Sequence, residues 1–427
     1  MRTLVYNIGC LAGVDRHGKL RLQGEEMAHL ERLEQAWLLV ENERIAGFGR
    51  MADWNEACGQ ADTSHARSAS RFGQVDVEVD ARGGYVLPCW CDPHTHIVYA
   101  GSREGEFVDK IRGLSYEEIA KRGGGILNSA DRLHQTSEEE LYRQALERAH
   151  EMMRKGTGCI EIKSGYGLNT ADELKMLRVI RRLKESLPVR IVSTFLGAHA
   201  VGRGYSQPAY VDLVVNEMIP EVGRQQLADY IDVFCDKGFF TPEETVRILE
   251  AGAQWGMKPK IHADELASSG GVVVGVEHQA LSVDHLERMA DEQLETLRGS
   301  RTMPTALPGT SFFLNMPFAP ARRMIDAGLG VAVASDYNPG STPSGDMKFV
   351  VSLACIKMRL LPEEALNAAT LNAAYAMGLS EEYGSIAVGK VANFFLTKPI
   401  PSLDYIPYAY TTPLVECLFL RGKEWMM

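Results

Sequence analysis

Short apolar runs alternate with segments of helical period from about residue 86 to residue 378 of this 427-residue chain, and few folds accommodate such a pattern. Eight apolar runs occur, and in order they read "YVLPCWC", "GCIEIKSG", "RIVSTFLGAHA", "YIDVFCD", "KPKIHADE", "ALSVDHL", "TMPTALPG" and "GVAVASDYNPG". The segments between them, such as "TADELKMLRVIRRLKESL", repeat apolar residues at helical spacing and begin with Thr, Asp or Pro. Eight strands that alternate with helices predict an α/β protein with a (β/α)8 TIM barrel.

The two ends of the chain lack this rhythm. The N-terminal end contains short alternating runs such as "TLVYNIGCL" and "AWLLVENERIAGFG", and the C-terminal end contains "GSIAVGKVANFFLTK" and "LVECLFLRGKEWM". Alternation with a period of two is typical of strands that are buried on one face. We therefore expect a small β-sandwich domain built from residues 1–80 and 385–427, with the barrel in residues 81–384.

The balance of charges narrows the class of partner. Charged residues make up 24% of the chain, the net charge is −11 and no block of like charge stands out, which argues against a nucleic acid or a membrane surface as partner. No apolar run reaches the roughly 18 residues of a membrane span, and no cleavable signal pattern is present. The eight cysteines are scattered without the pattern of a disulfide scaffold. We expect a cytoplasmic protein with reduced thiols that acts on a small molecule.

In a (β/α)8 barrel the active site is built at the C-terminal ends of the strands. Five of the eleven histidines fall at such predicted ends: His94, His96, His199, His262 and His285. His94 and His96 are two apart on an extended segment, so both side chains point into one site. With His262 and with Asp336 after the eighth strand, they offer three imidazole nitrogens and a carboxylate, a set that suits zinc or iron. The alternative is that His262 and Asp336 are ordinary polar groups near the rim.

Two cysteines, Cys89 and Cys91, stand just before this histidine pair and would be soft ligands for zinc. If the strand period of two holds, they point to the side opposite His94 and His96, toward the helices, where a free cysteine packs as a small apolar residue. A bulge near Pro93 would break this parity. We expect the metal to be bound without sulfur.

The order of several longer segments indicates a family. "DPHTHIVYAGSREGEF", "EIKSGYGL", "TFLGAHAV", "KIHADELASSGG", "SDYNPGS" and "NAATLNAA" resemble the amidohydrolase superfamily, over nearly the whole chain. Within it they are similar to the enzymes that open the cyclic amide of 4-imidazolone-5-propionate to N-formimidoyl-L-glutamate, the third step of histidine degradation. Members with two metal ions carry a bridging lysine on the fourth strand, whereas this strand reads "YIDVFCD". We therefore expect one zinc or iron ion per chain, and the resemblance further implies a homodimer.

The resemblance also implies catalytic roles. Glu265 and His285 belong to the catalytic centre of such enzymes, so we expect Glu265 to contact the ring and relay protons. His285 would polarise the carbonyl or position the water. Asp336, as a metal-bound carboxylate, could also accept the proton of the water. The division of these roles among the three residues stays open at this stage.

Substrate binding is expected to involve the first βα loop. Arg103 would hold the propionate with paired hydrogen bonds, although it could instead pair with Glu104 or Glu106. Tyr166 and His199 occupy positions where the resembling enzymes contact substrate. The loop after the eighth strand offers an amide, backbone N–H groups and a hydroxyl through Asn338, Gly340 and Ser341.

Two other functions remain open on the sequence. One is a different cyclic amidase, or an aminohydrolase of a purine or pyrimidine ring, which would use the same metal and water. The carboxylate clamp at Arg103 separates it from the first interpretation. The other is a catalytically silent barrel that serves as a binding or scaffold protein, and the intact set of ligands and acid–base groups argues against it.

Overall fold

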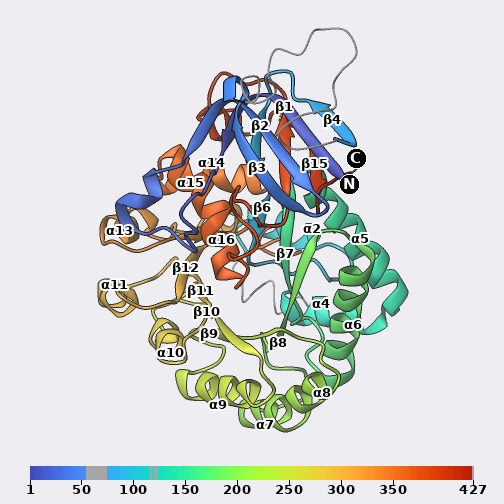
Figure 1. Cartoon of the computed structure of the whole chain (residues 1–427). Helices are drawn as coiled ribbons and strands as arrows, with labels where there is room; N and C mark the ends of the chain where they lie inside the picture. The colour runs from blue at the N-terminus through green and yellow to red at the C-terminus, as the bar shows by residue number, and fades with distance from the viewer. Residues whose placement is uncertain (54–74, 115–117, 119–123, 426–427) are drawn as a thin grey trace.

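The larger part of the molecule is a barrel of eight parallel strands with helices around it (Figure 1). The structure is a computed structural model that describes residues 1–53, 75–114, 118 and 124–425. Each barrel strand pairs in parallel with the next one along the chain. These strands are β6 Trp90–Asp92, β7 Thr157–Lys163, β8 Arg190–Ala198, β9 Tyr230–Cys235, β10 Lys258–Ala263, β11 Ser282–His285, β12 Met303–Ala306 and β13 Ala332–Val333. The predicted (β/α)8 barrel is confirmed.

The barrel closes between its first and last strands. Thr95 and Tyr337 form a parallel bridge, and the His96 N–H donates a hydrogen bond to the Tyr337 carbonyl at 2.9 Å. In return, the Asp336 N–H donates to the His94 carbonyl at 3.0 Å. The segments that carry the expected ligands His94, His96 and Asp336 are thus the seam of the barrel. Closure of the sheet brings together residues that are more than 200 positions apart in the sequence.

Helices follow most of the strands, and several begin at the polar residues that the sequence provides. The Asn169 side chain accepts a hydrogen bond from the Asp172 N–H at 3.0 Å, and Thr241 and Glu244 form a reciprocal capping box. The helices described are η1 Gly24–Ala28 (3₁₀), α2 Glu104–Ile111, α4 Ile126–Gln135, α5 Glu138–Arg154, α6 Thr170–Ser186, α7 Gln207–Leu213, η2 Val214–Met218 (π), α8 Ile219–Arg224, α9 Pro242–Ala253, α10 Gly271–Glu277, α11 Asp291–Leu297, α12 Pro308–Leu314, α13 Ala321–Asp326, α14 Met347–Met358, α15 Pro362–Ala369, α16 Leu371–Ala376 and α17 Tyr405–Tyr408. None of these helices has the length and apolar character that crossing a membrane would require.

A second sheet of eight strands gathers both ends of the chain at one end of the barrel, where Figure 1 shows the blue and red strands together. Its strands are β1 Arg2–Ala12, β2 Arg32–Glu41, β3 Arg44–Arg50, β4 Val77–Asp80, β5 Tyr85–Pro88, β14 Phe394–Thr397, β15 Val415–Leu420 and β16 Lys423–Trp425. Apolar residues from β1, β2, β14 and β15 share one buried cluster, in which the rings of Phe394 and Phe419 stack at 4.6 Å. The expected small β domain is therefore present.

The apolar run at residues 85–91, predicted as a single first barrel strand, is divided between the two sheets. Tyr85–Pro88 pairs with β1 and β14 in the small sheet, and the barrel begins only at Trp90. Cys89, between them, donates its backbone N–H to the Asn393 carbonyl at 3.1 Å. The division of the chain at residues 80 and 384 stays a prediction, and residues 54–74 of its first segment lie outside the described residues.

Candidate active site

The residues expected to form the site converge at the C-terminal mouth of the barrel. A cavity of about 410 Å³ lies there. Eleven of the twelve predicted residues line it: His96, Arg103, Tyr166, His199, His262, Glu265, His285, Asp336, Asn338, Gly340 and Ser341. The twelfth, His94, is completely buried, and its ring lies 4.3 Å from that of His262. The residues predicted from strand order and strand parity therefore lie together, and their roles stay a prediction.

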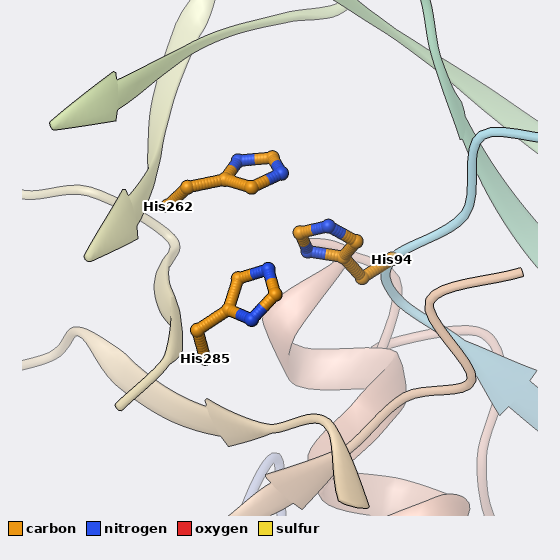
Figure 2. Close-up of side chains that lie close together, drawn as sticks. All are labelled: His94, His262 and His285. Atoms are coloured by element: carbon orange, nitrogen blue, oxygen red, sulfur yellow. The ribbon is translucent and has the colours of Figure 1, made fainter. Parts of the chain in front are cut away.

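Two groups of possible metal-binding atoms share His94. In the first, His94 Nε2 lies 3.2 Å from His96 Nε2, and Asp336 Oδ1 lies 3.6 Å from the former and 3.5 Å from the latter. In the second, the rings of His94, His262 and His285 face one another, as Figure 2 shows. The centroid of the His285 ring lies 5.4 Å from that of His94 and 5.3 Å from that of His262.

The state of the ring nitrogens fits a metal ion. His262 Nε2 is buried and has no hydrogen-bond partner among the described residues. A buried polar atom without a partner is costly, and neutral imidazole nitrogens beside a carboxylate are the donors that zinc and iron take. Burial lowers the pKa of His94 and of His96 well below the usual range, so both rings are neutral. The donor set therefore suits a cation, which would bind where these atoms meet.

Hydrogen bonds orient the carboxylate toward the histidines. Asp336 Oδ2 accepts hydrogen bonds from Thr310 Oγ1 at 2.6 Å and from Ser341 Oγ at 3.2 Å, which leaves Oδ1 to face the imidazoles. The backbone is strained nearby, since Asp336 has a φ of 54° and His285 a φ of 86°. Such conformations persist where the surrounding structure enforces them, and they are frequent at functional sites.

Two aspartates beneath the site were not predicted from the sequence. Asp284 Oδ2 lies 2.7 Å from Nδ1 of His94, and Asp232 Oδ2 lies 2.8 Å from Nδ1 of His262. Both carboxylates are completely buried. A signal was available, because each is an acidic residue inside a predicted barrel strand, in "YIDVFCD" and "SVDH". Carboxylates at this position orient a metal-binding imidazole.

Glu265 and His285, for which the sequence predicts catalytic roles, lie close together. His285 Nε2 lies 3.7 Å from Glu265 Oε2, and His285 Nδ1 lies 3.5 Å from Glu287 Oε2. Desolvation raises the pKa of Glu265 to about 7, and the neighbouring His285 counteracts this rise only in part. Burial by itself would lower the pKa of His285, but Glu265 and Glu287 hold it well above the ordinary value. A carboxyl group that titrates near neutral pH is suited to proton transfer.

Two cationic side chains, Arg103 and Lys110, line the end of the cavity away from the histidines. Arg103 Nη2 donates to Glu106 Oε2 at 2.5 Å, so the pairing with Glu106 considered above does form. Its side chain is nevertheless only 8% exposed, its Nε has no hydrogen-bond partner among the described residues, and it lines the cavity. Lys110, which was not predicted, also lines the cavity and donates to the Gly340 carbonyl at 2.9 Å. Its spacing of seven residues from Arg103, two helical turns, was the available signal.

Aromatic side chains form one wall. The rings of His96 and His199 stack at 5.2 Å with an interplanar angle of 14°, and the Tyr166 ring lies 5.4 Å from that of His199. His199 Nδ1 lies 3.0 Å from the Gly165 carbonyl, to which it donates as the N–H tautomer. Burial lowers the pKa of His199 to about 3. The neutral ring therefore keeps the lone pair of Nε2 available.

The loop after β13 is organised by Asn338. Its Nδ2 donates to the Asp336 carbonyl at 2.8 Å and to Ser341 Oγ at 2.6 Å, and its Oδ1 accepts from the N–H groups of Gly340 and Ser341, both at 2.8 Å. The amide of Asn338 is thus engaged within the loop, which fixes the shape of the cavity wall. That Asn338 also contacts substrate stays a prediction.

The cysteines before the histidine pair lie apart from the converging ligand atoms. Cys91 belongs to an apolar cluster with Cys159 and Tyr230, and Cys89 packs against Gly158. Burial raises the pKa of the Cys89 thiol well above its usual value. No cysteine belongs to either group of possible metal ligands found among the described residues. This arrangement agrees with the packing role expected from strand parity.

Comparison with known proteins gives a family. A protein of Christiangramia forsetii named imidazolonepropionase is 54% identical over 99% of this chain and 100% of its own length. One of the same name from Flavobacterium johnsoniae is 52% identical over 99% of this chain and all of its own length. The chain belongs to the imidazolonepropionase family. A model of the amidohydrolase family also matches residues 240–423, so the family likeness read from the sequence is confirmed.

Solved structures extend the likeness to the fold. An adenosine deaminase from Xanthomonas campestris with bound zinc has a TM-score of 0.68 at 16% identity, over 99% of this chain and 92% of its own. A triazine hydrolase variant has a TM-score of 0.74 at 16% identity, over 99% of this chain and 94% of its own. This chain thus has a barrel fold in common with these solved hydrolase and deaminase structures.

Proposed function

We propose that this protein hydrolyses the cyclic amide of 4-imidazolone-5-propionate to N-formimidoyl-L-glutamate, as a metal-dependent enzyme of histidine degradation. The observation that carries the proposal is a single cavity with a cluster of imidazoles and Asp336 at one end and Arg103 with Lys110 at the other. The substrate has a matching polarity, since a ring amide stands at one end and a carboxylate at the other. The names of the relatives that match the chain over its full length support the same reaction.

One zinc or iron ion per chain is proposed, with His94, His96, His262 and Asp336 as its ligands. When bound, such an ion supplies Lewis-acid activation of a water nucleophile at neutral pH. Lys163 at the end of β7 is held by Glu161 and Asp232 at 2.6 and 2.8 Å, and the fourth strand β9 has no lysine. The single-ion stoichiometry rests on this absence of a bridging lysine from Tyr230–Cys235.

The protein groups have distinct tasks in this proposal. Hydrolysis adds water to the ring carbonyl, breaks the adjacent C–N bond, turns the carbonyl into a carboxylate and leaves a proton on the ring nitrogen. Glu265, whose pKa of about 7 allows both proton uptake and release, relays protons to that nitrogen. His285, held cationic between Glu265 and Glu287, polarises the carbonyl oxygen or positions the water. Asp336 accepts the proton of the water in this proposal.

The propionate is proposed to lie against Arg103. A guanidinium can hold a carboxylate with two parallel hydrogen bonds, and Glu106 keeps the side chain oriented. Gly340 leaves room for it, because a Cβ at this position would lie 2.3 Å from Arg103 Nη1. Tyr166 and His199 complete the wall against which the ring would pack. Ser341, whose Oγ also contacts Asp336, lies between the two ends.

The decisive experiment is to incubate protein loaded with zinc or iron with 4-imidazolone-5-propionate and to follow the reaction by NMR. We expect N-formimidoyl-L-glutamate to form, and metal analysis to give one equivalent per chain. Activity on another cyclic amide or on an aminated base, without this product, would instead establish the aminohydrolase alternative. Two metal equivalents would contradict the single-ion site.

We also propose, from the resemblance to the family, that the protein is a cytoplasmic homodimer. Light scattering of the purified protein tests whether two chains assemble.

A further inference from the structure

A layer of five charged side chains lies inside the barrel beneath the candidate metal site. Each of these side chains is 0% exposed: Glu161, Lys163, Asp232, Lys260 and Asp284. They come from four of the eight barrel strands, β7, β9, β10 and β11. The proposed reaction uses neither of the two lysines. A buried charge is expensive unless it is paired, so a layer of this kind requires a reason for its presence.

Lysines link the carboxylates of this layer to one another. Lys163 Nζ lies 2.6 Å from Glu161 Oε1, 2.8 Å from Asp232 Oδ2 and 3.7 Å from Asp284 Oδ2. Burial alone would lower the pKa of Lys163, but Asp232, Glu161 and Asp284 hold it above its usual value, so the group stays charged.

Lys260 occupies the other side of the layer. Its Nζ donates to Glu161 and, at 2.7 Å, to the carbonyl of Pro93, the residue that directly precedes His94. It also lies 3.7 Å from Asp284 Oδ2. Lys260 therefore ties the backbone that carries the first expected ligand to the carboxylates beneath it.

Two of these carboxylates, Asp284 and Asp232, contact the proposed ligand imidazoles at Nδ1, the ring nitrogen that faces away from the site. Asp284 Oδ2 lies 2.7 Å from His94 Nδ1, and Asp232 Oδ2 lies 2.8 Å from His262 Nδ1. The other oxygen of each is engaged as well, by Ser282 Oγ for Asp284 and by the His262 backbone N–H for Asp232. An imidazole that donates Nδ1–H to a carboxylate has its lone pair on Nε2, the atom that faces the site.

We propose that Lys163 and Lys260 are positioning residues, which hold Asp232 and Asp284 so that His262 and His94 keep the Nδ1–H tautomer and direct Nε2 at the metal. This inference rests on the ligand set of the proposed function. Three carboxylates and two ammonium groups leave the layer with one negative charge, which also favours a cation above it. His96 provides an internal reference, because its one ion-pair contact among the described residues joins Nε2 to Asp336, whereas Asp232 lies 2.8 Å from Nδ1 of His262.

The test uses the full chain with two readouts that do not involve the reaction. Nitrogen-15 NMR of the metal-free protein reports the tautomers of the histidine rings, and competition with a chelator reports the affinity for zinc alone. The variants are Lys163→Met and Lys260→Met. Lys390→Met is the matched control, because Lys390 is also buried but donates to the Ser380 carbonyl and Ser385 Oγ, away from the site.

We expect each variant to weaken zinc binding by roughly 10- to 100-fold, the usual effect of removing an outer hydrogen-bond partner of a ligand. Lys163→Met should disturb mainly the tautomer of His262, and Lys260→Met mainly that of His94, whereas Lys390→Met should leave both unchanged. Unchanged tautomers and unchanged zinc affinity in both site variants would overturn the proposal.

A failure of a variant to fold, and a failure of the proposed function, can each be distinguished from a failure of this inference. If Lys163→Met does not fold, Lys260→Gln, which keeps N–H donors but removes the charge, carries the test, and native zinc affinity in it would refute the role. If the wild-type protein binds zinc but does not open imidazolone-5-propionate, the substrate assignment fails while both readouts stand. A wild-type protein without zinc affinity would remove the basis of the inference.

Discussion

Two cavities formed by the described residues differ in their chemistry, and the larger of the two has the fewer buried polar groups that could bind a ligand. A cavity of about 530 Å³ lies beside the small sheet, and its lining includes Asp15, His17 and Arg32. Its ion pairs are at least partly exposed: Arg32 lies 3.9 Å from Glu363, and the two side chains are 49% and 28% exposed. In the smaller cavity of about 410 Å³ the side chains of His96 and Asp336 are each only 3% exposed.

The difference between the two cavities shows which property indicates a ligand-binding site. Exposed ion pairs contribute little and can rearrange with solvent, so the charges around the larger cavity point to no particular ligand. The barrel cavity instead contains buried ring nitrogens that point at one another, and both groups of converging ligand atoms found among the described residues lie there. Convergence of buried donors, and not volume, distinguishes the two cavities. The predictions below compare matched changes in each.

The largest effect is expected for His94→Ala, because His94 belongs to both groups of ligand atoms. Zinc affinity should fall by more than about 100-fold, beyond the range for an outer hydrogen-bond partner, and hydrolysis should be lost with it. Metal content after dialysis, with circular dichroism as a check on folding, measures this. His29→Ala, in the lining of the larger cavity, is the matched control and should keep metal and activity. Metal retained in His94→Ala would place the ion elsewhere.

How much of the fold and the site could be predicted from the sequence depends on whether a feature is set along one strand or by contacts between strands. The βα rhythm fixes which residues stand at strand ends, and strand parity fixes which way they point, so His94, His96 and His262 could be placed together. Partners across strands were out of reach: the contact between Asp284 and His94 joins residues 190 positions apart and depends on side-chain packing. For the same reason the run at residues 85–91 read as one strand, although its first part pairs with β1 and β14.

A smaller but specific effect is expected for Arg103→Ala. The loss of a charge-assisted pair is worth roughly 1.5–3 kcal/mol, so KM for the propionate-bearing substrate should rise by about 10- to 100-fold while kcat changes little. Steady-state kinetics measures both constants. Arg32→Ala, in the larger cavity, removes an equal charge from an exposed pair and should alter neither. An unchanged KM in Arg103→Ala would eliminate the clamp and revive the aminohydrolase alternative.

Gly340→Ala should weaken the same clamp without removing it. The added Cβ would meet Arg103 Nη1 at 2.3 Å, and the guanidinium must move because it is the flexible partner. We expect KM to rise about fivefold, equivalent to about 1 kcal/mol and less than the full charged hydrogen bond. Gly105→Ala is the control, since nothing lies within 4 Å of a Cβ there. Combined with Arg103→Ala, the Gly340 effect should vanish, and additive effects would show that Gly340 acts independently.

The smallest effect on function is expected from substitution of Cys89 and Cys91, the pair that could be taken from the sequence for sulfur ligands of a metal. Cys89→Ala together with Cys91→Ala should retain the full metal content and KM, because both thiols pack against apolar or backbone groups and neither faces the histidines. Stability should nevertheless fall, by roughly 1 kcal/mol for each buried sulfur that is removed. Urea unfolding and metal analysis separate the two quantities. Loss of metal at unchanged stability would make the cysteines ligands after all, whereas loss of stability alone assigns them to the packing between the first barrel strand and its surroundings.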